Sequence, residues 1–358
     1  PAWNEALGLP RPWDQQWSLR MQQIMAYETD LLEYEDLFDC NPAVDRKVAA
    51  LKDGARSELA QIDAMGGAVG AIEYMKSSLV TSNADRIVNI EQGDMTVVGV
   101  NKFQNGEPSP LTAGDDAIMV VDPAMEAEQV SRLTAWKSER DPVAVERAIA
   151  AIRQAAKDGT NIMIPSIAAA KVGVTTGEWG DVVRDAFGQY RGPTGVSANP
   201  SNRTEGLDEI RDAVSVVSDK LGRKLKFLMG KPGLDGHSNG AEQIASRARD
   251  CGMDIAYEGI RLTPDEIVTA AREADVHVVG LSILSGSHIP LMQDLMNKMA
   301  DAGLTHIPVV VGGIIPEDDA DRLRAMGVSQ VYTPKDFELN RIMFDIVALA
   351  DSQATAAE

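Results

Sequence analysis

Five successive strand–helix pairs, from about residue 222 to the end, most constrain how this chain can fold. The predicted strands are apolar throughout rather than alternating with polar residues, as is typical of strands buried on both faces of a parallel sheet. The strands fall within 224–230, 253–259, 275–284, 306–313 and 328–334, and the helices within 240–252, 263–274, 289–303, 316–327 and 335–350. This order predicts an α/β fold, a doubly wound five-stranded parallel sheet with helices on both faces.

Residues suited to binding a ligand follow three of these predicted strands. They are Lys231, Asp235, Gly236, His237 and Gly240 after the first strand, Ser282 and Leu284 at the end of the third, and Gly312 and Gly313 at the end of the fourth. Each cluster alone is ordinary turn chemistry. Because the carboxyl ends of parallel strands meet at one edge, where such sheets bind ligands, we expect the three clusters to form one site.

The common phosphate and zinc motifs do not account for this site. No Gly-x-Gly-x-x-Gly follows the first strand, and the sequence has no Gly-Lys-Ser/Thr loop. His277, His288 and His306 lie on separate predicted elements, without the paired spacing of zinc ligands, and His277 is predicted to be a packed core residue. The site therefore offers one imidazole, oriented by one carboxylate, and glycine-lined room for a large ligand.

Asp-x-His-x-x-Gly, Ser-x-Leu and Gly-Gly at these strand ends resemble the Rossmann-like cobalamin-binding domain of the base-off, His-on type. The resemblance covers roughly residues 222 to 350. In that family a histidine replaces the cofactor's own base as the lower ligand of cobalt. The resemblance implies that His237 binds the cobalt of cobalamin, that Asp235 holds its other ring nitrogen, and that Lys231 interacts with Asp235.

The same resemblance assigns roles to the other clusters. Gly236 and Gly240 complete the motif around the histidine. Ser282 and Leu284 would line the slot for the displaced nucleotide tail of the cofactor. At Gly312 and Gly313 the missing side chain would let that tail approach the backbone.

The first hundred residues indicate a reaction. "NEALGLP" (4–10), "AMGGAVGAIEYM" (64–75) and "VVGVNKF" (97–103) resemble the last part of the catalytic barrel of acyl-CoA mutases. The resemblance implies three parts: residues 1–103 as the C-terminal portion of a (β/α)8 barrel, 104–221 as a mainly helical linker, and 222–358 as the cobalamin-binding domain. It also implies that Glu5 binds the ribose of the adenosyl group, although the family's partner asparagine falls at Pro1. The catalytic residues would lie mostly upstream of Pro1, so none is assigned.

Within that family, residues 9–39 resemble the ethylmalonyl-CoA mutase group and lack the Asp-Pro-Trp-Gly-Gly-Ser type loop of methylmalonyl-CoA mutases. The implied function is an adenosylcobalamin-dependent isomerase that converts ethylmalonyl-CoA to methylsuccinyl-CoA by a radical migration of the carbonyl-CoA group. A methylmalonyl-CoA mutase and a cobalamin carrier or sensor module are the alternatives. A response-regulator-like or flavodoxin-like sheet with an incidental histidine is the structural alternative.

Local patterns upstream predict three further elements. Helical spacing of apolar residues predicts a helix within 44–65. The pair Asp141-Pro142 predicts the start of a helix that ends at Gly159. The β-branched run from Met95 to Phe103 predicts a short buried strand.

Composition limits the partners. A formal charge of −20 repels phosphate backbones and anionic lipid, so nucleic acid and membrane partners are not expected. Two distant cysteines, Cys40 and Cys251, and no signal-peptide pattern favour a reducing, cytoplasmic location. Because the chain begins at Pro1, we expect it to be part of a longer polypeptide that carries the upstream half of the barrel. The expected partners are an acyl-CoA substrate and, from the family, a second copy in a homodimer.

Overall fold

The computed structural model describes residues 9, 11–106, 122–196, 206–333, 335–336 and 338–356. The chain divides into two compact units, one formed by Pro1–Met119 with Pro193–Glu358 and the other by Val120–Gly192. The parallel sheet belongs to the first unit. In its described residues, the second unit contains helices and no strand.

The sheet has five strands in the order β2-β1-β3-β4-β5, and every neighbouring pair is parallel. The strands are β1 (Lys226–Gly230), β2 (Asp254–Ala256), β3 (Val278–Ile283), β4 (Val309–Gly313) and β5 (Gln330–Tyr332). The predicted doubly wound sheet is therefore confirmed. The chain leaves β1 toward β2 on one side and returns to β3 on the other, so the carboxyl ends of β1 and β3 flank the point where strand order reverses.

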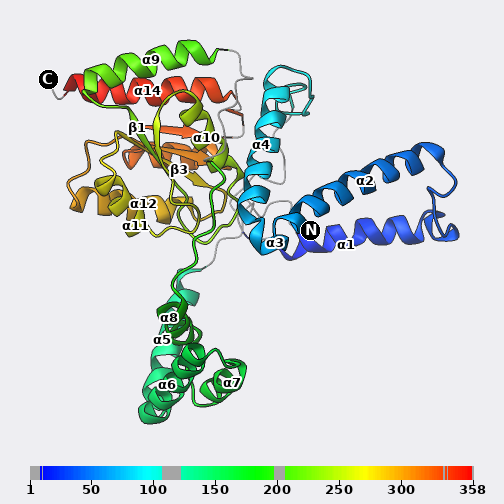
Figure 1. Cartoon of the computed structure of the whole chain (residues 1–358), viewed down its shortest axis with the longest axis vertical. Helices are drawn as coiled ribbons and strands as arrows, with labels where there is room; N and C mark the ends of the chain where they lie inside the picture. Colours follow the sequence, from blue (N-terminus) through cyan, green and yellow to red (C-terminus); the bar gives the residue numbers. More distant parts are fainter. Residues whose placement is uncertain are drawn as a thin grey trace. The chain divides into compact units, whose positions relative to one another are not determined.

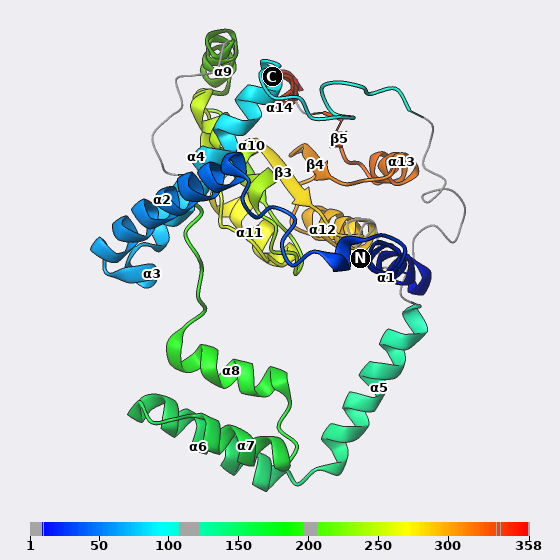
Figure 2. The same ribbon diagram turned by 90° about the vertical axis from the view of Figure 1, so that its right-hand side faces the viewer.

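Helices cover both faces of the sheet (Figures 1 and 2). One face packs against α9 (Leu207–Leu221), α10 (Asn239–Asp250) and α14 (Leu339–Ala356), and the other against α11 (Pro264–Glu273), α12 (His288–Asp301) and α13 (Glu317–Ala325). Successive residues of β1 alternate between the two cores: Phe227 and Met229 enter the first and Leu228 the second. Helix α9 lies inside the span assigned to the linker, and it packs in the first core.

The residues before the sheet are mainly helical where they are described. They form α1 (Pro12–Tyr27), the 3-10 turn Leu31–Glu33, α2 (Pro42–Ala64), α3 (Gly67–Gly70) and α4 (Ile72–Glu91). Helix α2 confirms the helix predicted within 44–65. Its first turn is capped by the Asn41 side chain, which accepts hydrogen bonds from the backbone N–H groups of Ala43 and Val44.

The buried strand predicted from Met95 to Phe103 is wrong. The segment is a turn with one isolated bridge between Val98 and Lys102, and Val98 and Phe103 are 71% and 76% exposed. The Asn101 side chain organises it by donating to the carbonyls of Ile90 and Met95. Among the described residues no strand lies beside the segment, so its β-branched content finds no pairing partner there and the turn chemistry prevails.

The second unit consists of α5 (Pro123–Glu139), α6 (Pro142–Asp158), α7 (Met163–Lys171) and α8 (Thr176–Phe187). Helix α6 begins and ends as predicted: the Asp141 carboxylate caps its first turn, and Gly159 adopts a left-handed conformation after its last. Ile152, Ala169 and Val182 form the small core of the unit.

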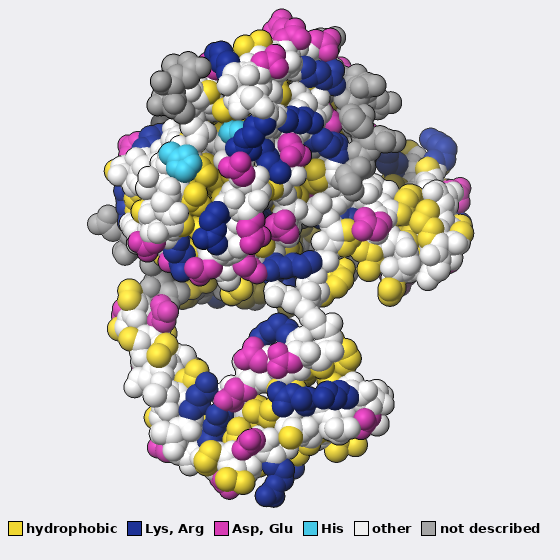
Figure 3. Space-filling view, turned by 60° about the vertical axis from the view of Figure 1, so that its left-hand side comes forward, with side chains coloured by type: hydrophobic (Ala, Val, Ile, Leu, Met, Phe, Trp, Pro, Cys, Tyr) yellow, Lys and Arg dark blue, Asp and Glu magenta, His cyan; other side chains and the backbone are white. Residues whose placement is uncertain are grey.

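On the face drawn in Figure 3, acidic and basic side chains are interspersed rather than gathered into one patch of either sign. Among the described residues, no helix is both long enough and apolar enough to cross a membrane. The cysteines are free, Cys40 exposed and Cys251 buried.

Candidate functional site

A chain of three side chains, Lys231, Asp235 and His237, occupies the loop after β1. The Lys231 ammonium donates to Asp235 Oδ2 at 2.7 Å, and His237 Nδ1 lies 2.6 Å from Asp235 Oδ1. The backbone N–H of His237 donates to the same oxygen at 3.1 Å. The carboxylate thus fixes both the rotation of the imidazole and the backbone that carries it.

Burial decreases along this chain of contacts from Lys231 to His237. The Lys231 side chain is 0% exposed and that of Asp235 11%, whereas that of His237 is 83% exposed. Lys231 also lies 3.5 Å from the carbonyl oxygen of Ser282, at the end of β3. Two buried residues therefore hold an imidazole that faces outward.

The electrostatics of the three residues fix the tautomer of the histidine. Burial alone would raise the pKa of Asp235, but the hydrogen bonds from Lys231 and His237 outweigh it and lower the pKa to about 2. An ionised Asp235 only accepts hydrogen bonds, so His237 Nδ1 must carry a proton. In a neutral ring Nε2 then carries a free lone pair, and no described residue forms a hydrogen bond with it. This is the state in which an imidazole binds a metal.

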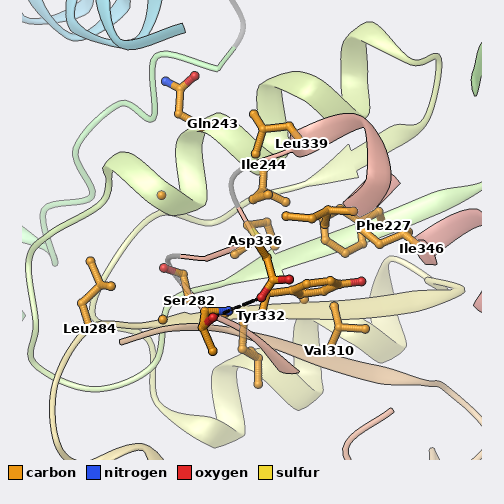
Figure 4. A pocket seen from close by; sticks show the side chains of 18 of the residues that line it. Phe227, Gln243, Ile244, Ser282, Leu284, Val310, Tyr332, Asp336, Leu339 and Ile346 are labelled. Atoms are coloured by element: carbon orange, nitrogen blue, oxygen red, sulfur yellow. Dashed lines mark hydrogen bonds between the residues drawn. The ribbon is translucent and has the colours of Figure 1, made fainter. Parts of the chain in front are cut away.

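A cavity of about 260 Å³ lies on the same side of the sheet as α10 and α14. Its lining, drawn in Figure 4, is mostly apolar. The predicted residues Gly240, Ser282, Leu284, Gly312 and Gly313 all line it, so the three strand-end clusters do converge. The volume lies below the roughly 300–1,000 Å³ of pockets that take a whole drug-sized ligand. It would hold one part of a larger molecule.

The two glycines at the end of β4 differ in what they do. A Cβ on Gly313 would lie 1.8 Å from the carbonyl oxygen of Ile283, so the sheet itself requires glycine there. A Cβ on Gly312 would lie 3.8 Å from the Cβ of Tyr332, which is an ordinary contact. It would project among the residues that line the cavity. Of the two, Gly312 is the position that keeps space for a ligand.

Much of the cavity wall was not predicted from the sequence. The additional lining residues are Phe227, Met229, Ile244, Val310, Tyr332, Thr333, Asp336, Leu339, Ile342 and Ile346, among others. Thr333 donates to Asp336 Oδ2 through its backbone N–H at 2.8 Å (Figure 4), and the Tyr332 hydroxyl donates to Asp345. Tyr332 and Thr333 stand at the carboxyl end of β5, so the rule that selected the other three strand ends would have found them.

Helix α4 supplies part of the same wall through Asn83 and Ile87. These residues precede the sheet by more than a hundred positions, and no local pattern marks them. Helix α4 is held against α10 and α14 by polar contacts: Gln243 donates to the carbonyl of Val80, and Glu91 accepts from Arg247 and from the backbone of Leu339.

These residues fit a corrinoid with a displaced nucleotide tail. An exposed imidazole with a free Nε2 suits the metal of a cofactor that lies outside the domain. The neighbouring apolar cavity suits the ring that the cofactor's nucleotide tail carries. Gly236 is exposed in the same loop. Glu5 lies outside the described residues. His277 is 4% exposed, as predicted for a core residue, and its Nδ1 accepts from the backbone of Lys226.

Two family models match the chain. A model described as "Methylmalonyl-CoA mutase" matches residues 1–189, and a model described as "B12 binding domain" matches residues 225–336. The second match covers the whole loop of Lys231, Asp235 and His237 and four of the five strand–helix pairs.

Three curated relatives align over almost the whole chain. An ethylmalonyl-CoA mutase from Cereibacter sphaeroides is 68% identical over 358 residues, which is 100% of this chain and 55% of the relative. An ethylmalonyl-CoA mutase from Methylorubrum extorquens is 56% identical, covering 98% and 51%. A methylmalonyl-CoA mutase from Escherichia coli is 32% identical, covering 93% and 48%. The chain thus spans about half the length of the curated relatives it matches.

Proposed function

This chain belongs to the methylmalonyl-CoA mutase family, and from that premise we propose that it is the cobalamin-binding part of an adenosylcobalamin-dependent ethylmalonyl-CoA mutase. The observation that carries the cofactor assignment is the outward-facing imidazole of His237, held by the ionised Asp235. The substrate assignment is supported by identities of 68% and 56% to ethylmalonyl-CoA mutases against 32% to a methylmalonyl-CoA mutase.

In this proposal each residue of the site has a task. His237 Nε2 ligates cobalt, Asp235 keeps the proton on Nδ1, and Lys231 keeps Asp235 ionised. The apolar cavity beside Ser282 and Gly312 takes the nucleotide tail and shields it from water. When bound, the cofactor supplies the radical chemistry of the rearrangement, and the protein supplies position and exclusion of water.

The remaining assignments are part of the same proposal. Residues 1–103 form part of a catalytic barrel together with the further length that the relatives have, and Glu5 contacts the adenosyl group there. Residues 104–221 connect that barrel to the cobalamin domain of 222–358. The enzyme is a cytoplasmic homodimer whose substrate is an acyl-CoA.

A titration with cobalamin tests the cofactor assignment. The absorption spectrum of the bound cofactor should report replacement of its own base by histidine, and His237→Ala should abolish that change. His306→Ala is the matched control, because His306 is exposed on another element. Binding with the cofactor's own base still on cobalt would refute the assignment of His237.

An isomerase assay tests the reaction. The protein extended upstream to the length of its relatives should convert ethylmalonyl-CoA in preference to methylmalonyl-CoA. The 358-residue chain alone should convert neither. Turnover of ethylmalonyl-CoA by this chain without added polypeptide would contradict the proposal that further polypeptide completes the catalytic barrel. Preference for methylmalonyl-CoA would favour the alternative mutase, and turnover of neither by the extended protein would favour a carrier or sensor.

A further inference from the structure

Two anchors hold the loop that carries His237. On its first side the loop is tied within the sheet domain: Gly233 N–H donates to the carbonyl of Leu262, and Leu262 N–H donates to that of Lys231, both at 3.1 Å. Between the anchors the loop is open to solvent, with Leu234 90% exposed. A second anchor, at the other end of the loop after His237, therefore decides where that end lies.

That second anchor comes from helix α4, through Lys76. The Lys76 ammonium donates to Ser238 Oγ at 3.1 Å and forms an ion pair with Glu242. Ser238 directly follows His237, and Glu242 lies in the first turn of α10. Figures 1 and 2 both place α4 beside α10. One side chain thus joins the helical region before the sheet to the residue next to the predicted cobalt ligand.

The contact with Ser238 replaces an ordinary helix cap. Ser238 occupies the N-cap position of α10, where a serine hydroxyl usually accepts from a backbone N–H of the first turn. Here the side chain makes no such bond, and its oxygen accepts from Lys76 instead. The hydroxyl therefore links two elements rather than stabilising one.

The partner Glu242 depends on Lys76. The Glu242 side chain is 2% exposed, while that of Lys76 is 25% exposed. A carboxylate so deeply buried requires a counter-charge, and Lys76 is the cation that the described structure pairs with it. Gly195 closes over the same residue, since a Cβ there would lie 2.9 Å from the Lys76 carbonyl oxygen. Lys76 is therefore confined in both backbone and side chain.

We propose that Lys76 is a positioning residue for the cobalamin ligand: it fixes the start of α10, and with it the side of the loop from which His237 reaches the metal. The inference rests on the proposed function, because it concerns the presentation of His237 to a corrinoid. It goes further in placing control of the metal ligand in the region before the sheet domain, outside the B12-binding match.

The test measures histidine ligation rather than activity. The 358-residue chain, labelled with 15N-histidine, is saturated with cobalamin in its Co(II) form, and electron paramagnetic resonance reports nitrogen splitting from the axial ligand. Lys76→Met should lower the fraction of histidine-ligated cobalt and raise the dissociation constant about tenfold. Lys76→Arg, which keeps the charge, should recover most of both. Arg86→Met is the control, since Arg86 is an exposed cation of the same helix.

A second variant covers the case in which Lys76→Met does not fold. Ser238→Ala removes only the hydroxyl that accepts from Lys76 and leaves the ion pair with Glu242, and it should lower histidine ligation in the same direction by about threefold. Unchanged splitting in Ser238→Ala and in any folded Lys76 variant would overturn the inference alone. Absence of histidine splitting in the wild-type chain would refute the proposed function, and this inference with it.

Discussion

The two edges of the sheet each carry a histidine, and the two side chains differ in their exposure to solvent. At the amino edge His277 is 4% exposed, accepts a hydrogen bond from the backbone of Lys226, and has a buried Nε2 without a partner among the described residues. At the carboxyl edge the His237 side chain is 83% exposed, while the residues behind it are buried. The ring that packs within the fold is enclosed, and the ring proposed to bind cobalt is exposed on largely buried supports.

The ion pairs show the same inversion. Lys226, at the start of β1, pairs with Asp254 at 3.2 Å in a partly exposed contact. Lys231, just after the end of β1, pairs with Asp235 in a contact that excludes water almost entirely. Substitutions at the carboxyl edge should therefore cost more stability than matched ones at the amino edge, except at His237 itself.

The largest loss of stability is expected for Gly313→Ala. The new Cβ would lie 1.8 Å from the Ile283 carbonyl oxygen, so β4 must shift, at about 3 kcal/mol or more. Gly312→Ala is the matched control and should cost under about 1 kcal/mol, while weakening cobalamin binding by narrowing the cavity. Guanidinium unfolding and cobalamin titration of both variants separate the two roles. Equal stability of the two variants would contradict the claim that the sheet requires glycine at position 313 and not at position 312.

Lys231→Met should follow, with a loss of about 2–3 kcal/mol. The change leaves Asp235 buried without its cation, so the pKa of Asp235 should rise from about 2 toward or above its ordinary value. The wild-type contribution of this carboxylate is present above the unfolded pKa near 3.8 and is lost as pH falls toward about 2. Lys226→Met, which breaks a partly exposed pair, should cost under about 1 kcal/mol. If Lys231→Met cost as little stability as Lys226→Met, the contrast between the two edges of the sheet would be refuted.

His277 should make the chain less stable in mild acid. Burial lowers the pKa of His277 below its ordinary value of 6.5, and Arg223 lowers it further while Asp275 opposes the shift. The unfolded chain then binds a proton that the folded chain does not, so stability is full above pH 6.5 and falls below it. Between about pH 7.5 and about pH 5.5, His277→Phe should remove about 1 kcal/mol of that pH dependence. His306→Phe, at an exposed histidine, should leave it unchanged; the reverse pattern would show that His277 titrates freely.

His237→Ala should have the smallest effect on stability, under about 0.5 kcal/mol, because the ring is exposed. Its effect on cobalamin binding should nevertheless exceed that of the other substitutions, since the metal ligand is lost. Thermal unfolding and titration of the same preparation measure both. A destabilised variant with normal binding would mean that the ring belongs to the fold.

Sequence patterns predicted the sheet well because its signals are local. An apolar run followed by a helical pattern recurs five times after residue 222, and all five strands formed where the runs lie. The strand predicted from Met95 to Phe103 failed because pairing depends on a neighbour that a local pattern does not reveal. Asn101 and its side-chain hydrogen bonds decided the outcome there.

The candidate site was predictable where it follows strand ends and was not where it depends on packing. Ser282, Gly312 and Gly240 meet at one cavity because topology brings carboxyl ends together. Asn83 and Ile87 reach the same cavity because α4 packs against α10, and that contact joins residues over a hundred positions apart. The burial of Lys231 is likewise a property of the assembled sheet.

A crystal structure of the 358-residue chain with adenosylcobalamin would test the central claim most directly. We predict a bond from His237 Nε2 to cobalt, the Nδ1 contact to Asp235 retained, and the nucleotide tail in the cavity beside Ser282 and Gly312. A cofactor whose own base remains on cobalt, or an imidazole turned away from the metal, would contradict it.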